Sequence, residues 1–315
     1  APSIRSTLSM GGNPVTGGPG HTASCILDCT FAWVTDASAV KVIDLRDPDL
    51  PVDLGTFPTP AGGGVATHDV QVDGDGYVWV VGFGGAAAYR LPRGYAGAGL
   101  GELVLTTDAQ GNSTYFTELG LGDGSAANDY ILHNSLRRPG STTLYVTEED
   151  YTRPGCRGAG SFSTWSVDTT GRKKLGSEQS HVLDTWQTEL LADTAQPAAV
   201  CSAHYFDERD GIVAQGWYQQ GTRFLDVSDP TNIRQIGYLV APGALTWAAH
   251  FAPTDPTGRI VYSLDAVSGI TVLRLGGPGA GEAPTVTAPV LASWTAPLDA
   301  VSPSTTFGTA CFLAV

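Results

Sequence analysis

A repeating sequence unit constrains the fold of this chain more than any other feature. AVKVIDLRDPDLPVDLGTF, Ala39 to Phe57, and GTRFLDVSDPTNIRQIGYL, Gly221 to Leu239, follow one pattern. Each has an alternating apolar segment that ends in Asp, then an Asp-Pro turn, then a second alternating segment. Such alternation predicts β-strands, and Asp-Pro initiates turns because Asp caps backbone amides while Pro presets φ. Degenerate copies begin at Gly85, Gly160 and Gly269.

Each copy is preceded by another strand-like segment and, before that, by a segment that contains a histidine. The five histidines are His21, His68, His133, His204 and His250. The separation from each histidine to the matching position of the later strand is 23 residues for Asp44, 22 for Arg90, 22 for Asp226, 24 for Arg274 and 35 for Asp168. Four of the five separations agree within two residues. The third unit is longer because it contains the loop around Cys156.

Units of about 45 residues with four antiparallel strands are the size of propeller blades. We place them at 21–67, 68–132, 133–203, 204–249 and 250–300. The sequence therefore predicts an all-β chain, with one β-propeller domain over 1–315 and four-stranded antiparallel blades. Five blades are preferred and seven are the alternative, because the second and third units are long. We expect the terminal segments to pair and close the ring, since closure removes exposed strand edges.

Charge and composition exclude some classes of function. The net charge of −14 disfavours nucleic-acid binding, because a phosphate backbone would be repelled. No apolar run approaches the roughly 18 to 20 residues of a membrane span. The start Ala1-Pro2-Ser3 is typical of a chain whose signal peptide has been removed, and five cysteines fit an oxidising compartment, so we expect a secreted or extracellular protein. The favoured disulfides are Cys25–Cys29 and Cys156–Cys201, with Cys311 unpaired; the alternative is Cys29–Cys311.

Two phrases, VKVIDLRDP and RFLDVSDP, resemble the LVIVD-repeat family of β-propellers. GHTASCILDCTFAW, THDV, LHNSL and CSAHYF are similar to secreted bacterial members of that group. The resemblance runs from about His21 to Leu275 and implies the propeller fold. It implies almost nothing about function, because propellers host many chemistries. In similar sequences an aromatic residue often stands where this chain has His250.

Equivalent positions in successive blades would place the five histidines around the propeller axis. Neutral imidazole is a good ligand for a divalent transition metal such as Cu, Fe, Zn or Mn, and three ligands with an open position make a catalytic site. The predicted metal ligands are therefore His21, His68, His133, His204 and His250. The carboxylates expected to orient them are Asp69, Asp129, Glu148, Glu149 and Asp207.

The favoured function is a secreted metal-dependent enzyme, with redox or Lewis-acid chemistry on a small organic substrate. One alternative is a non-catalytic propeller that binds a ligand or a protein. Another is a metal-assisted polysaccharide lyase, in which Arg137, Arg138 and Arg153 would neutralise a uronate. The histidines would instead be structural if they joined blades by hydrogen bonds, as in WD-type propellers, or one of them would be a metal-free catalytic group. Their variable side-chain neighbours argue against a structural network, because such a network would repeat its acceptor.

Other aromatic and histidine residues have simpler interpretations. We expect a buried core role for Trp79, Trp165, Trp217 and Trp247, which recur in the predicted strands. We expect Tyr151, Trp186 and Tyr218 to contribute to pocket walls. His181 falls outside the register, so we expect it on an outer strand or loop.

Overall fold

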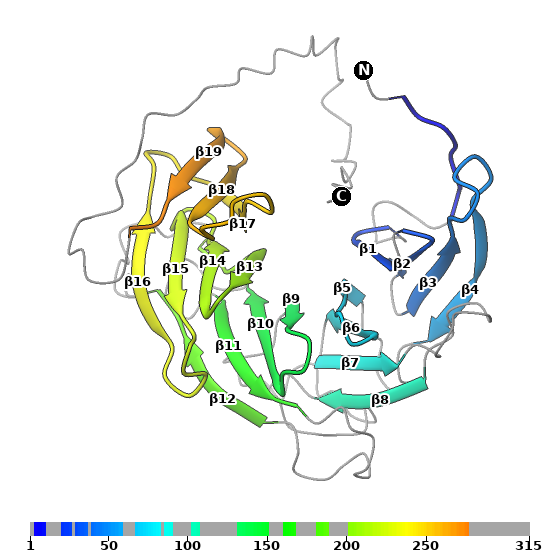
Figure 1. Cartoon of the computed structure of the whole chain (residues 1–315), viewed down its shortest axis with the longest axis horizontal. Coiled ribbons are helices and arrows are strands. Elements are labelled where there is room, and N and C mark those ends of the chain that lie inside the picture. The colour runs from blue at the N-terminus through cyan, green and yellow to red at the C-terminus, as the bar shows by residue number, and fades with distance from the viewer. Residues whose placement is uncertain are drawn as a thin grey trace. The chain divides into compact units, whose positions relative to one another are not determined.

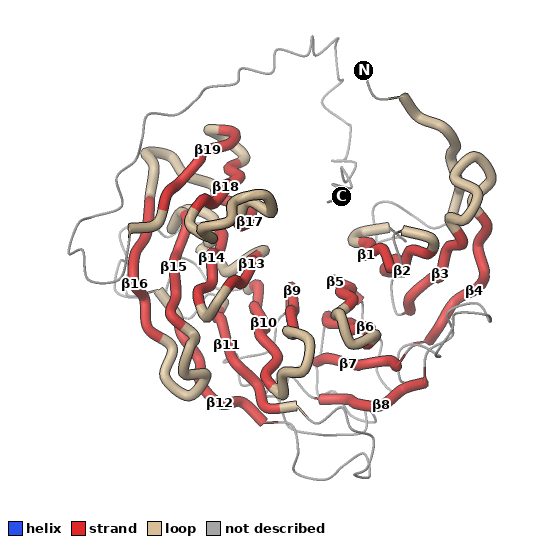
Figure 2. The backbone as a smooth tube through the Cα atoms, viewed as in Figure 1, coloured by secondary structure: helices blue, strands red, loops and turns tan. Residues whose placement is uncertain are grey.

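The computed structural model describes residues 3–10, 20–26, 29–36, 39–58, 67–82, 85–90, 102–107, 131–150, 160–167, 181–188 and 201–276. Within these ranges the chain forms strands joined by turns, and no helix (Figures 1 and 2). The described residues therefore include no helix able to cross a bilayer.

The strands form five sheets in which each strand is hydrogen-bonded to the next one along the chain. The first sheet contains β1 (Ala23–Ile26), β2 (Phe31–Asp36), β3 (Ala39–Asp44) and β4 (Val52–Pro58), and the second contains β5 (Thr67–Val72), β6 (Tyr77–Gly82), β7 (Gly85–Arg90) and β8 (Glu102–Thr107). The third contains β9 (Ile131–Arg137), β10 (Thr143–Glu149), β11 (Ser161–Ser166) and β12 (His181–Trp186). The fourth contains β13 (Phe206–Arg209), β14 (Ile212–Gly216), β15 (Thr222–Asp226) and β16 (Arg234–Leu239), and the fifth contains β17 (Thr246–Phe251), β18 (Ile260–Asp265) and β19 (Gly269–Arg274).

The predicted repeat is confirmed in backbone detail. In both Asp-Pro turns the first Asp accepts a hydrogen bond from the amide two residues later, Asp49 for Asp47 and Thr231 for Asp229, each at 3.0 Å. The pairing of the third strand with the fourth carries a β-bulge just before the strand ends, at 42/43 in the first sheet, 88/89 in the second and 224/225 in the fourth. A bulge inserts one residue and strengthens the local twist, so these sheets share one shape as well as one order.

The chain divides into two compact units. The first contains Ala1–Leu144, Ser166–His181 and Pro297–Val315, and the second contains Tyr145–Trp165 and Val182–Ala296. The division passes through the third sheet, whose four strands remain hydrogen-bonded in one sheet. One boundary of the predicted repeats, at 249/250, falls inside β17.

Apolar side chains from facing sheets form a core within each unit. In the first unit the core joins the first and second sheets through Phe31, Trp33, Val40, Val42, Val70, Val78, Val80, Ala87 and Tyr89. In the second unit it joins the fourth and fifth sheets through Ala214, Phe224, Ala249, Phe251, Val261 and Leu273. These four sheets are therefore stabilised by burial of apolar side chains in pairs, since removing apolar surface from water is the main favourable term in folding.

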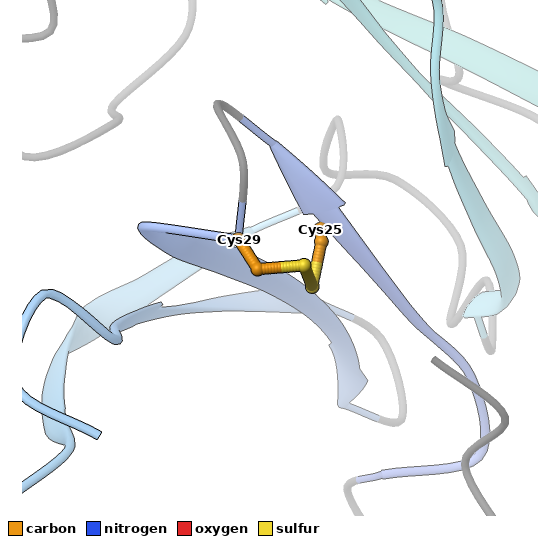
Figure 3. The surroundings of a disulfide bond; sticks show 2 residues. All are labelled: Cys25 and Cys29. Atoms are coloured by element: carbon orange, nitrogen blue, oxygen red, sulfur yellow. A yellow bond between two sulfur atoms is a disulfide. The ribbon is translucent and has the colours of Figure 1, made fainter. Parts of the chain in front are cut away.

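A disulfide joins Cys25 and Cys29 across the turn between β1 and β2 (Figure 3). The predicted pairing is confirmed, and the alternative Cys29–Cys311 is wrong because Cys29 is already bonded. Cys201 is also disulfide-bonded. Its predicted partner Cys156, like Cys311, lies outside the described residues. Disulfides are compatible with an extracellular protein.

Candidate metal centre

Four of the five predicted histidines lie at the start of the first strand of a sheet. In the first sheet Ile26 pairs with Phe31, and His21 lies five residues before Ile26. In the fourth sheet Arg209 pairs with Ile212, and His204 lies five residues before Arg209. His133 is the third residue of β9.

In the second sheet His68 occupies the same position, but in the fifth sheet the position belongs to Trp247 and not to His250. The backbone amide of Asp73 donates to the carbonyl oxygen of Tyr77 at the start of β6. The backbone amide of Ala252 donates in the same way to the carbonyl oxygen of Ile260 at the start of β18. The residues five positions earlier are His68 and Trp247. Both are the extra residue of a β-bulge, between Thr67 and Asp69 in β5 and between Thr246 and Ala248 in β17. The prediction that His250 is the fifth equivalent histidine is therefore wrong.

In the first unit three histidines follow one another in contact. The His21 ring hydrogen-bonds to the backbone of His68, and His68 Nδ1 hydrogen-bonds to the carbonyl oxygen of His133 at 2.9 Å. The ring centroids are 4.2 Å apart for His21 and His68, and 4.1 Å apart for His68 and His133. His21 is exposed, His68 is half-buried and His133 is fully buried.

The hydrogen bond of His68 determines its tautomer. A carbonyl oxygen only accepts, so Nδ1 of His68 carries the proton and Nε2 of the neutral ring carries a lone pair. Burial, with a smaller contribution from the nearby His21, lowers the pKa of His68 to about 3, so the ring is neutral at physiological pH. Metal-binding histidines generally donate their other ring N–H to a carbonyl or carboxylate in this way.

Asp69 joins the strands that carry His68 and His133. Its Oδ2 accepts from Asn134 Nδ2 at 2.7 Å and from Gln71 Nε2 at 3.2 Å. Burial raises the pKa of Asp69 to about 6, against the effect of these hydrogen bonds. The sequence led us to expect that carboxylates would set the histidine tautomers, but for His68 a backbone carbonyl does so and Asp69 holds β5 to β9.

In the second unit His204 has the same backbone hydrogen bond but different neighbours. Its Nδ1 donates to the carbonyl oxygen of Trp247 at 2.6 Å, so Nε2 of the neutral ring again has the lone pair. That Nε2 lies 3.6 Å from Oε1 of Glu149. The hydroxyl of Tyr218 donates to the same carboxylate oxygen at 2.5 Å. His204 and Glu149 are 3% and 2% exposed, so this polar cluster is buried.

The distance between His204 Nε2 and Glu149 Oε1 can be compared with that of a hydrogen bond and with that of two ligands on one metal ion. At 3.6 Å it is longer than the 2.7 to 2.9 Å of a charge-assisted hydrogen bond. Two tetrahedral ligands, each about 2.1 Å from one ion, lie about 3.4 Å apart. The pair thus has nearly the spacing of two ligands on a shared cation.

One carboxylate and two histidines form the candidate metal group, His68, His133 and Glu149. Each offers one ligand atom, and these atoms lie within 4.8 Å of one another. His133 and Glu149 belong to neighbouring strands of the third sheet, β9 and β10. Two tetrahedral ligands of one ion lie about 3.4 Å apart, so a pair at the 4.8 Å limit would need to approach by about 1.4 Å to share a tetrahedral ion.

The remaining predicted site residues lie elsewhere or have other contacts. His250 is half-exposed, with Nδ1 4.0 Å from Asp207 Oδ2, and that carboxylate accepts from the amide of Phe251. Glu148 accepts from the hydroxyl of Ser161. His181 begins β12, an edge strand of the third sheet. Asp129, Tyr151 and Arg153 lie outside the described residues.

The structure also revises two expectations about aromatic and basic residues. Trp79, Trp165 and Trp217 are fully buried as predicted, but Trp247 is 47% exposed. Trp186 packs edge-to-face on Trp217. Arg137 is buried between Asp73 at 2.7 Å and Asp75 at 2.8 Å, so its charge is already neutralised.

Sequence reasoning placed Glu149 among the carboxylates that support the ligands, whereas the structure brings it into the ligand group itself. In the sequence, only the acidic run Glu148-Glu149-Asp150 indicated that a carboxylate from this strand could join the histidines. Because successive side chains of a strand point to opposite faces, Glu148 and Glu149 of β10 diverge, and only the packing of β10 shows which one meets the histidines.

No protein-family model matches the chain, and no curated protein matches it in sequence. Among solved structures, a protein from Lactobacillus plantarum is similar over 81% of this chain and 66% of its own length, just under two thirds, with a TM-score of 0.58 and 12% identity. The β-propeller domain of Cps50 (Swd1) from Myceliophteria thermophila is similar over 79% of this chain and 68% of its own length, with a TM-score of 0.52 and 10% identity.

The fold is a β-propeller. At these identities the likeness shows the fold alone, and the number of blades and membership of the LVIVD-repeat family stay predictions. The propeller explains why the first strands of successive sheets carry equivalent residues, since each sheet repeats one blade.

Proposed function

We propose that this β-propeller binds a divalent transition metal through His68, His133 and Glu149. The observation that carries the proposal is the convergence of their ligand atoms within 4.8 Å. Burial keeps His68 neutral, and its hydrogen bond to a backbone carbonyl leaves Nε2 available to a metal. His204, 3.6 Å from Glu149, is the candidate fourth ligand.

The donor set favours a redox-active or Lewis-acidic metal. Two histidines and one carboxylate with open positions are typical of non-haem iron sites, and imidazole equally suits Cu, Zn and Mn in mixed sites. When bound, the metal would polarise or activate a small organic substrate or dioxygen. The neutral ring of His68 and the buried ring of His133 would hold the ion, and the buried surroundings of Glu149 would exclude bulk water. We propose a secreted metal-dependent enzyme of this kind, related to the LVIVD-repeat propellers.

A structural role for the histidines is the second candidate, and one observation favours it. Three of these histidines hydrogen-bond to the backbone of the equivalent residue in the next sheet: His21 to His68, His68 to His133, and His204 to Trp247. The acceptor therefore does repeat, contrary to the sequence argument, because it is a backbone carbonyl. Such a network would stabilise the fold whether or not a metal is bound.

The lyase alternative has less support. Arg137 was one of three arginines expected to neutralise a uronate, but its guanidinium is 2% exposed and bonded to Asp73 and Asp75. A polyanionic substrate would have to rely on other cations. A small neutral or weakly charged organic molecule, or a neutral saccharide, is the substrate class we propose.

Metal analysis of the full chain tests the proposal. The protein is expressed without a histidine tag or chelator, loaded separately with Fe²⁺, Cu²⁺, Zn²⁺ and Mn²⁺, desalted and analysed for metal. We expect about one equivalent of at least one metal in the wild type, and under about a tenth in His68→Ala and Glu149→Gln. His250→Ala is the matched control and keeps its metal. A metal-free wild type, with only a lower melting temperature in His68→Ala, would leave the structural role.

A further inference from the structure

We infer that Tyr218 is a positioning residue for the metal centre, holding the carboxylate of Glu149 in the orientation that faces His204. The inference rests on the proposed metal site and adds to it a residue that neither the ligand pattern nor the histidine repeat indicates. Tyr218 comes from the turn after β14, and Glu149 ends β10, so the two residues are 69 apart in sequence.

The contact itself is direct and buried. The Tyr218 hydroxyl lies 2.5 Å from Glu149 Oε1, and it is the donor because an ionised carboxylate only accepts. Tyr218 is 4% exposed, so bulk water does not compete for the carboxylate. Hydrogen bonds of this kind to a ligating group typically change metal affinity 10- to 100-fold.

The backbone of Tyr218 is held in an uncommon conformation. Its φ is +36°, and the other described non-glycine residues with positive φ are Cys29 and Asp210. Cys29 is tied by its disulfide, and Asp is among the residues that tolerate this region. An aromatic residue is unfavourable there, and such conformations persist where the surroundings over-determine them, often at functional sites.

Thr246 supplies that constraint. Tyr218 N donates to Thr246 O at 2.9 Å, and Thr246 N donates to Tyr218 O at 2.8 Å. Gly221 N also donates to Tyr218 O, which closes the turn. Thr246 directly precedes Trp247, whose carbonyl accepts the Nδ1 proton of His204. One pair of backbone hydrogen bonds thus holds both the partner of Glu149 and the partner of His204.

The geometry makes the tyrosine hydroxyl replaceable without removing the ring. The Tyr218 ring packs 4.8 Å from the His204 ring, and a phenylalanine keeps that contact. Tyr218→Phe therefore removes the hydrogen bond to Glu149 and keeps the ring. Tyr262→Phe is the matched control, because Tyr262 of β18 pairs with His250 of β17 and is 37% exposed.

The test measures Co²⁺ binding to the full chain by its visible absorption and by competition with Zn²⁺. We expect Tyr218→Phe to bind Co²⁺ 10- to 100-fold more weakly than the wild type and to change the absorption bands, which report ligand geometry. Tyr262→Phe is expected to match the wild type in both readouts. A wild type that binds neither ion overturns the proposed metal site and this inference together. A wild type that binds, with Tyr218→Phe equal to it in affinity and spectrum, overturns only the role of Tyr218, even if the variant melts at a lower temperature.

Discussion

In both units a histidine at the start of a sheet's first strand donates a hydrogen bond to a backbone carbonyl, but the side chains around that histidine differ. In the first unit His68 donates to the carbonyl of another histidine, and the rings of His68 and His133 lie 4.1 Å apart. In the second unit His204 donates to the carbonyl of Trp247, which is 47% exposed, and its Nε2 faces Glu149. The hydrogen bond needs only a backbone carbonyl, so it forms in both units. The neighbouring side chains, which differ between the two units, decide the chemistry at each histidine.

The first strands of the third and fourth sheets, β9 and β13, also differ in the contacts of the arginine at their ends. This difference is expected to have the largest effect on the free energy of unfolding. Arg137 ends β9 and is buried between two aspartates, whereas Arg209 ends β13, is 30% exposed and donates to the carbonyl of Ala252. We expect Arg137→Ala to lower the free energy of unfolding by about 3–5 kcal/mol, because it leaves buried Asp73 without its cation. Arg209→Ala should cost less than about 1 kcal/mol. Urea denaturation of both variants measures the contrast, and equal losses would contradict it.

His68 and its neighbour Asp69 are expected to change the stability of the protein in opposite directions as the pH falls. The pKa of His68 is lowered to about 3, so the folded state resists protonation and stability falls as pH drops below about 6.5. The pKa of Asp69 is raised to about 6, so its contribution has the opposite sign and stability rises as pH drops from about 6 towards 4. By pH 4.5 the effect of His68 amounts to about 3 kcal/mol and that of Asp69 to about 2 kcal/mol.

Substituting one of these two residues should reveal the pH dependence of stability that the other one causes. In metal-free Asp69→Asn we expect a steep loss of stability between pH 6.5 and 4.5, and in His68→Gln we expect a gain over the same range. The wild type should vary less than either variant. Melting temperatures across this range, each compared with the same variant at pH 7.5, test the signs. Parallel curves for all three proteins would show that these two residues do not control the response.

The contrast between a buried and a half-exposed histidine gives a smaller effect. His133 is fully buried against His68, while His250 pairs with Tyr262 at the surface. We expect His133→Ala to cost about 1–3 kcal/mol in metal-free protein, because it removes ring contacts and a buried polar group. His250→Ala should stay within about 0.5 kcal/mol. A comparable loss in both would mean that His250 also belongs to the stabilising network.

The smallest effect tests whether the strand-start positions are interchangeable. Trp247→His places a histidine at the bulge position that His68 occupies in the second sheet. Because Trp247 is half-exposed and its carbonyl is unchanged, we expect a stability change within about 1 kcal/mol and no change in metal content. Thermal denaturation and metal analysis of this single variant suffice. A larger loss would show that the indole ring itself supports His204.

Much of the fold was predictable because its signals are local. Asp-Pro turns, alternating apolar residues and a constant separation from histidine to strand end are all printed in the sequence, and the repeated turns and bulges agree with them. The site was only partly predictable. His68 and His133 were among the expected ligands, but His250 was assigned to a position that a bulge gives to Trp247. A one-residue bulge shifts a register without leaving a clear sequence signal.

The sequence by itself determined the unit of four strands, its repetition and the histidines at the strand starts, since each depends on residues close together in the chain. Only the tertiary structure decided that the acceptors are backbone carbonyls, that Glu149 rather than Glu148 meets the histidines, and that Tyr218 bonds to Glu149. Carbonyl acceptors have no residue identity to read. Contacts between residues far apart in sequence arise only when the sheets pack and bury them together.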